Sequence, residues 1–247
     1  MVYKSDALIL RTYKLGEADR IVVFLTRDRG KKRGVAKGAR RPKSRYTGAL
    51  EPLTRGEVAY FEREQRELVQ LNYVDVVRSP LLAHSGEALG HVGYFAELID
   101  EWAPEAHADE RLFRLGASMV DAIAVGAPID KLARYFEYWL LRLQGVYPAL
   151  ACAGCSATLM PGAVMPPREH MFVCRRCAPS GGGTDLSSMA MQFLAAAGSV
   201  APEKLEPLSL STAASRELEI AHRRLIGLHL EKELKSARVL REMRHSR

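Results

Sequence analysis

The sequence lacks the features of membrane and secreted proteins. It contains no run of eighteen apolar residues, so we expect no transmembrane helix. Its first six residues, MVYKSD, have neither the charged start nor the long apolar middle of a signal peptide. We therefore expect a cytoplasmic protein, in which thiols stay reduced and available to a metal.

Two enzyme signatures are also missing. The chain has no G-x-x-x-x-G-K-[ST] loop, because Gly181–Gly183 is not followed by lysine and is typical of a linker. A zinc deaminase needs a glutamate in an H-x-E motif, and His107-Ala108-Asp109, the nearest approach, lacks it. We therefore expect no enzyme.

Cysteine is scarce, and its placement is informative. The four cysteines form two C-x2-C pairs separated by eighteen residues. They are Cys152, Cys155, Cys174 and Cys177. This spacing predicts one structural zinc ion held by four thiolates. Two disulfides would need an oxidising compartment, and a redox C-x-x-C is not expected twice. His170 could replace one cysteine, although four thiolates already fill the shell.

Positive charge is concentrated at one end of the chain. The net charge is +7, but residues 1–60 hold 15 Lys/Arg against 6 Asp/Glu. Residues 81–151 hold 5 Lys/Arg against 10 Asp/Glu. This asymmetry indicates a polyanion bound mainly by the first part of the chain.

The first eighty residues read as short strands. The expected strands are Ala7–Tyr13, Ile21–Thr26, Gly34–Ala39, Glu57–Phe61 and Glu67–Tyr73. Five strands without a helical apolar pattern predict a small closed sheet, with the OB barrel favoured. An SH3-like barrel is the competing interpretation, and the sequence does not separate the two.

The stretch from Arg29 to Arg45 has nine Lys/Arg and no Asp/Glu. Uncompensated charge of this density favours a groove that follows phosphates, and a solvated basic loop is the alternative. Four aromatic residues are candidates for base stacking, although most aromatics of a small barrel fill its core. They are Tyr13, Tyr46, Tyr60 and Phe61. No base-reading helix is present, so sequence-specific readout is not expected.

The rest of the chain is helical apart from the cysteine segment. We expect helices from Ser79-Pro80, from about Asp109 and from Pro128, then a helix capped by Asp185 and a long one from Ser211. The basic end of the last helix, 232–247, is interpreted as a helix terminus and tail, with a secondary nucleic-acid contact as the alternative. The expected domains are an OB domain (1–79), a helical domain (80–151 and 181–247) and an inserted zinc finger (152–180). The fold class is therefore α+β and multidomain.

The order of these parts resembles the RecO family of bacterial recombination mediators. The likeness is carried by Leu8-Ile9-Leu10 with Gly16-Glu17-Ala18-Asp19, by the segment GVAKGARRPKS from Gly34, and by the helix from Tyr135 that leads to Cys152. Each motif alone is modest, but their order along the whole chain is specific.

The resemblance implies a function and a set of partners. Proteins similar to this one bind single- and double-stranded DNA, anneal complementary strands, and act with RecR and the tail of single-strand binding protein so that RecA loads onto DNA. It also implies association with the nucleoid. Carried onto this chain, the DNA-binding role falls on Arg33, Lys37, Arg40, Arg41, Lys43 and Arg45. An RNA-binding or ribosome-associated OB protein with a zinc finger is the alternative function, since its charge and fold would look alike.

Overall fold

The computed structural model describes residues 1–63, 66–82, 86–105 and 107–245. The chain divides into two compact units. The first contains Met1–Gly126 together with Leu234–Arg247, and the second contains Ala127–Glu233. The domain limits expected from the sequence stay a prediction.

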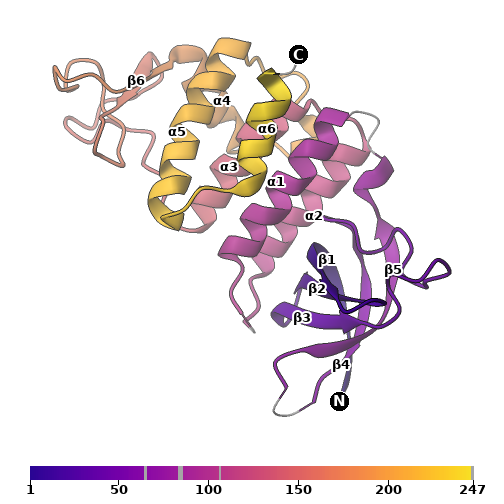
Figure 1. Ribbon diagram of the computed structural model, residues 1–247. Coiled ribbons are helices and arrows are strands. Elements are labelled where there is room, and N and C mark those ends of the chain that lie inside the picture. Colours follow the sequence, from indigo (N-terminus) through magenta and orange to yellow (C-terminus); the bar gives the residue numbers. More distant parts are fainter. Residues whose placement is uncertain (64–65, 83–85, 106, 246–247) are drawn as a thin grey trace. The chain divides into compact units, whose positions relative to one another are not determined.

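Five strands of the first unit form a closed barrel (Figure 1). They are β1 (Val2–Leu15), β2 (Asp19–Thr26), β3 (Gly30–Ala36), β4 (Arg55–Phe61) and β5 (Val69–Arg78). The barrel order is β1-β2-β3-β5-β4, and it closes through a parallel β3–β5 pairing and an antiparallel β1–β4 pairing. This is the arrangement of an OB-type barrel, so the fold expected from the strand pattern is confirmed.

Alternating side chains of these strands fill the barrel. Ile9, Phe24 and Tyr60 are fully buried in one apolar cluster, as the period-two pattern of strands requires. The loop between β3 and β4 adds Tyr46, whose hydroxyl donates to the carbonyl of Leu71 at 2.7 Å. The loop that follows the cationic part of β3 is therefore anchored in the core.

Three α-helices complete the first unit. They are α1 (Gly86–Trp102), α2 (Glu110–Ala124) and α6 (Lys235–His245), and a short 3₁₀ turn, η1 (Pro80–Leu82), precedes α1. Both α1 and α2 pack on β1, where a Cβ on Gly116 would lie 2.6 Å from Leu8 Cδ1. The absence of a side chain at that position therefore allows α2 to approach the strand closely.

The C-terminal helix α6 packs along α1 within the first unit (Figure 1). The carboxylate of Glu97 on α1 accepts hydrogen bonds from the backbone N–H of Lys235 at 3.1 Å and of Ser236 at 2.7 Å. A carboxylate at this end of a helix satisfies free N–H groups and complements the helix dipole. The last helix is thus capped by a residue far away in the sequence.

The second unit consists of helices and a small sheet. The helices are α3 (Ile129–Leu143), α4 (Ser188–Ala197), α5 (Thr212–Leu230) and the 3₁₀ turn η2 (Pro202–Lys204). α3 packs against both α4 and α5. The sheet pairs β6 (Gly162–Met165) with β7 (Thr184–Ser187) in antiparallel register, and the cysteine segment is built around it.

Two expectations about the helices are wrong. Asp185 lies in β7, and Ser187 caps α4 instead, accepting from the N–H of Ala190 at 3.3 Å. The long helix from Ser211 does not continue to the C-terminus, because Glu231 adopts a left-handed φ of 53° and ends α5. In the part of the chain that the structure describes, no helix is long and apolar enough to cross a membrane.

Candidate nucleic-acid interface and metal centre

The cationic segment Arg29–Arg45 begins at the turn before β3, runs along β3 and continues into the β3–β4 loop. The loop is tied to the β1–β2 turn by Arg40, whose N–H donates to the carbonyl of Ala18 at 2.9 Å. The guanidinium of Arg40 also donates to the carbonyl of Gly16 at 2.8 Å. With Tyr46 buried behind it, the loop holds its cations in a defined place on the barrel.

Three of the expected DNA-binding residues keep their full charge available. Lys37, Arg41 and Lys43 are exposed, and among the described residues they form no ion pair. The guanidinium of Arg45 lies over the ring of Tyr46, 5.0 Å from its centroid, on the solvent side. Lys37, Arg41 and Lys43 form a cationic surface on the loop. We call these three residues the β3–β4 loop cations.

Other cations of the segment are neutralised by residues distant in the sequence. The ammonium of Lys31 is buried and lies 3.4 Å from carboxylate oxygens of both Asp100 and Glu105. Arg33 is exposed, and its guanidinium lies 3.1 Å from the carboxylate of Glu105. The expectation that the whole segment is uncompensated is therefore wrong. The carboxylates that pair with Lys31 and Arg33 come from the end of α1 and the loop after it, and Lys32 lies 2.9 Å from the carboxylate of Glu62.

A groove of about 350 Å³ crosses the outer face of β1, β2 and β3. It is lined by Arg11, Tyr13, Ile21, Val23, Lys31, Arg33, Leu68, Asp100 and Glu101. The guanidinium of Arg11 pairs with Asp100 and lies 3.6 Å from Glu101. This part of the barrel face is therefore close to electrically neutral, unlike the neighbouring loop.

The four aromatic candidates for base stacking separate by burial. Tyr46 and Tyr60 are buried in the barrel core, and burial raises the pKa of Tyr60 to about 12. Tyr13 is 46% exposed in the groove, with the guanidinium of Arg11 5.7 Å from its ring centroid. Phe61 is half-buried at the end of β4. Only Tyr13 and Phe61 are open to an unpaired base.

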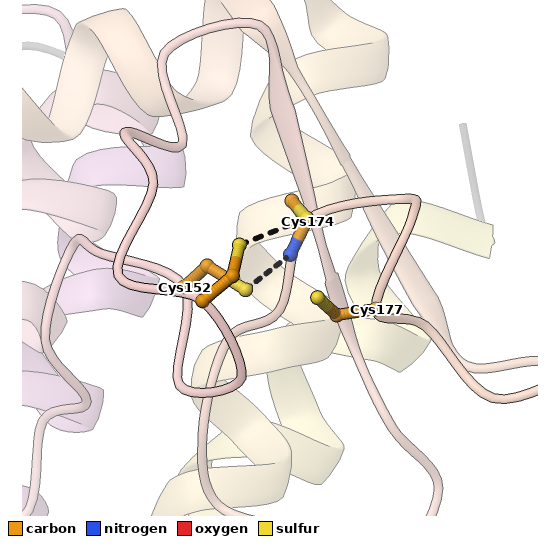
Figure 2. A group of neighbouring side chains, drawn as sticks. Cys152, Cys174 and Cys177 are labelled. Atoms are coloured by element: carbon orange, nitrogen blue, oxygen red, sulfur yellow. Dashed lines mark hydrogen bonds between the residues drawn. The ribbon is translucent and has the colours of Figure 1, made fainter.

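The four cysteines gather at one point of the second unit. Figure 2 labels three of them, Cys152, Cys174 and Cys177. Their four sulfur atoms all lie within 4.8 Å of one another. The sulfurs of Cys155 and Cys174 are 3.8 Å apart, and all four residues are free thiols. A disulfide bond would need about 2.05 Å, so the cluster is not a pair of disulfides.

Local backbone geometry brings the sulfurs together. The N–H of Ser156 donates to the carbonyl of Cys152 at 2.8 Å in a turn where Ser156 has a left-handed φ of 58°. In the second turn the N–H of Cys177 donates to the carbonyl of Cys174 at 3.0 Å. A Cβ on Gly154 would lie 3.2 Å from the sulfur of Cys177, so glycine at this position allows the two turns to approach.

Hydrogen bonding polarises the thiols. The N–H of Cys174 donates to the sulfur of Cys152 at 3.2 Å and is the main reason that the pKa of Cys152 is lowered to about 6. Hydrogen bonds among the sulfurs, first with Cys155, raise the pKa of Cys177 to about 12. A bound metal cation would displace the remaining thiol protons.

This cluster is suited to a metal ion. A tetrahedral shell with metal–sulfur bonds of about 2.3 Å places sulfurs about 3.8 Å apart, which matches the separation of Cys155 and Cys174. No other group of three or more His, Cys, Asp or Glu side chains within the described ranges is arranged to hold a metal. His170 is not part of the cluster, so the four cysteines alone form the candidate ligand set.

Comparison with known proteins covers both units. Residues 1–80 match the family model described as Recombination protein O N terminal, and residues 83–238 match Recombination protein O C terminal. This chain belongs to the RecO family. The RecO family places it among proteins of DNA repair and recombination.

Several curated RecO proteins are similar over most of the chain. "DNA repair protein RecO" of Koribacter versatilis (strain Ellin345) is 40% identical over 179 residues, which cover 70% of this chain and 72% of that protein. The RecO protein of Anaeromyxobacter sp. (strain K) is 36% identical over 97% of this chain and 96% of its own length. That of Desulforudis audaxviator (strain MP104C) is 32% identical over 98% and 97% respectively.

One polar network in this RecO-family chain was not expected from the sequence. In the second unit the buried carboxylate of Glu137 on α3 lies 3.1 Å from the guanidinium of Arg134 and 2.9 Å from Nδ1 of His222 on α5. The hydroxyl of Tyr147 lies 2.9 Å from Nε2 of the same imidazole. Arg134, Glu137 and His222 lie on helices that otherwise read as apolar packing elements, and Tyr147 follows α3, so only their proximity in the fold reveals the network.

The protonation of this network follows from its geometry. Burial lowers the pKa of His222, although its hydrogen bond to the carboxylate of Glu137 acts in the opposite direction. The guanidinium of Arg134 already balances the negative charge of Glu137, so the network needs no positive charge on the imidazole of His222. With the proton on Nδ1, the imidazole donates to Glu137 and accepts from the hydroxyl of Tyr147, and both nitrogens are satisfied.

Proposed function

We propose that this RecO-family chain is a recombination mediator that binds single- and double-stranded DNA and anneals complementary strands. Together with RecR it helps RecA load onto DNA coated by single-strand binding protein. The single observation that carries the DNA-binding part is the cationic surface on a fixed loop of the OB-type barrel, formed by Lys37, Arg41 and Lys43. Arg40 and Arg45 extend this surface, and Arg33 joins it where a phosphate takes the place of the Glu105 carboxylate.

The physical basis of annealing is charge screening. Two DNA strands repel each other through their phosphates, and a cationic surface that binds both backbones lowers that repulsion. Base pairing between the strands then supplies the free energy and the specificity. The protein needs no catalytic step and no nucleotide for this activity.

The cysteine cluster supports a second part of the proposal. Cys152, Cys155, Cys174 and Cys177 hold one structural Zn²⁺, because four thiolates in a closed tetrahedral shell leave no open position for chemistry. The ion would replace the thiol protons and tie the two cysteine turns to each other. A reducing cytoplasm keeps the thiols available for this role.

Annealing of two complementary labelled oligonucleotides tests the function. Without nucleotide, we expect rapid annealing that slows as salt rises, because counterions compete for the same phosphates. Competition with RNA of equal length and sequence separates the proposal from an RNA-binding OB protein. Preferential displacement by RNA, or binding without any annealing, would contradict the mediator function.

A further inference from the structure

We propose that the outer face of the barrel where β4, β5 and β3 meet holds one unpaired nucleobase. The inference rests on the proposed DNA-binding function and adds to it a specific contact. The site is a pocket of about 480 Å³ whose lining is more apolar than that of the groove. It is formed by Val35, Lys37, Phe61, Arg63, Arg66, Glu67, Leu68, Val69 and Gln70.

Strand register places three side chains in one row on this face. Gln70 on β5 pairs with Phe61 on β4 and with Val35 on β3. Directly paired residues point to the same side of a sheet. The adjacent row contains Tyr60 and Leu71, which point into the barrel core, so Phe61, Gln70 and Val35 point outward.

The row has the chemistry of a base-binding surface. The half-buried ring of Phe61 offers a π-face, and the aliphatic side chains of Val35 and Leu68 lie beside it. Aromatic faces of this kind bind bases by stacking, whatever the base, because every base has a π-face. The site therefore fits an unpaired base better than it fits a phosphate.

Gln70 adds a polar group in the middle of this apolar floor. Within residues 1–63, 66–82, 86–105 and 107–245 its side-chain amide has no hydrogen-bonding partner. An amide presents both a donor and an acceptor, which can pair with the edge of a base. One amide beside a stacking ring gives contact with every base and at most a modest preference among them.

Cations surround the pocket where a strand would pass. Lys37, Arg63 and Arg66 are exposed at its rim, and Glu67 is the only carboxylate among the described residues that line it. The guanidinium of Arg63 lies 5.5 Å from the ring centroid of Phe61. We expect it to leave the ring for a phosphate when a base stacks there. Lys37 also belongs to the β3–β4 loop cations, so the strand that enters the pocket continues onto that surface.

The pocket distinguishes single strands from duplexes. A base inside a duplex is stacked and paired, and its face is not available to Phe61 without unpairing. Double-stranded DNA would therefore bind through phosphates alone, to Lys37 and its neighbours. The stacking contact contributes only to single-strand affinity.

Replacing Phe61 by alanine tests this assignment on the full-length, zinc-loaded protein. We expect Phe61→Ala to weaken binding of a labelled oligothymidylate about 5- to 150-fold, the usual effect of losing one stacked base. Affinity for a duplex and the salt slope should stay unchanged, because no phosphate contact is lost. Phe61→Tyr should retain wild-type affinity, and an abasic oligonucleotide should bind the wild type and Phe61→Ala equally.

Tyr73→Ala is the matched control, since Tyr73 is another partly exposed aromatic of the same barrel whose hydroxyl donates to Glu57 at 2.7 Å. It should leave oligothymidylate binding unchanged. Thermal unfolding of Phe61→Ala and Phe61→Leu checks that the barrel is intact. Unchanged single-strand binding by Phe61→Ala, or an equal loss for single strands and duplexes, would overturn the pocket. A wild-type protein that binds no DNA would instead refute the proposed function itself.

Discussion

Removing the β3–β4 loop cations should lower both DNA affinity and its dependence on salt. The variant is the triple substitution Lys37→Gln, Arg41→Gln and Lys43→Gln. All three side chains are exposed and, among the described residues, form no ion pair, so their charge is fully available to phosphates. The substitutions lie outside the barrel core, and the anchor of the loop, Tyr46, is untouched.

The magnitude follows from counterion release. Each phosphate contact on a single strand contributes about 0.7 to the slope of log K against log salt, so three contacts contribute about 2. When salt rises from about 50 to 200 mM, the fold decrease in affinity should therefore be roughly twenty times larger for the wild type than for the triple variant.

A second variant tests the same reasoning in the opposite direction. Glu105→Gln removes the carboxylate that lies 3.1 Å from Arg33 and so releases that guanidinium to DNA. Because this ion pair is exposed, it contributes only about 0.2–1 kcal/mol. The substitution also removes a carboxylate 3.4 Å from the buried ammonium of Lys31, which keeps the carboxylate and the carbonyl of Asp100 as partners, so the fold should stay intact. We expect a steeper salt slope, by about 0.7, and tighter binding at low salt.

Fluorescence anisotropy of a labelled oligothymidylate at three or more salt concentrations measures both slopes. Glu110→Gln is the control, because Glu110 pairs with Arg27 at 2.6 Å and neither residue lines the groove or the pocket. An unchanged slope in the triple variant would mean that DNA follows another surface. An unchanged slope in Glu105→Gln would mean that Arg33 does not meet phosphate.

Two further predictions concern the second unit. Elemental analysis should find one zinc per chain, and a reduced, unchelated preparation without metal would contradict the site. The variant Cys174→Ala should lose the metal and have a lower melting temperature, because structural zinc contributes about 10–16 kcal/mol of apparent binding free energy in isolated fingers. Because the pKa of His222 is lowered in the folded protein, the unfolded chain binds a proton at a higher pH than the folded one does. The contribution of this residue to the free energy of unfolding is therefore fully present above about pH 6.5 and decreases as the pH falls below that value. Calorimetry should show a flatter pH dependence of the melting temperature for His222→Asn, and equal pH dependence in both proteins would refute this.

Local patterns in the sequence were sufficient for the barrel and for the cysteine cluster. Strands are recognised by alternation and turn residues, and a C-x2-C pair already fixes two ligands within one turn. The expected clustering of Cys152 with Cys174 needed only a gap long enough to fold back, and the antiparallel pairing of Val164 with Val173 provides that return. Such features depend on residues close together in the chain, which is why they were predictable.

Pairings between distant residues were not predictable in the same way. The stretch Arg29–Arg45 contains no acid, yet Lys31 is buried against Asp100, and Lys32 lies 2.9 Å from Glu62. The return of α6 to the first unit depends on a left-handed residue at Glu231, which no sequence pattern signals. Charge counted along a segment therefore overstates the charge that the folded surface offers.

The base pocket and the annealing activity are compatible because stacking a base on the protein and stacking it in a duplex have similar free energies. Stacking one base on a protein aromatic contributes about 1–3 kcal/mol, and each stacked step of a DNA duplex about 1.4 kcal/mol. A base held by Phe61 can therefore leave for a complementary strand at little net cost, while Lys37 and Arg41 keep the backbone bound. A deep pocket for many bases would instead compete with pairing. One shallow pocket beside a cationic loop can hold a single strand and still release it into a duplex.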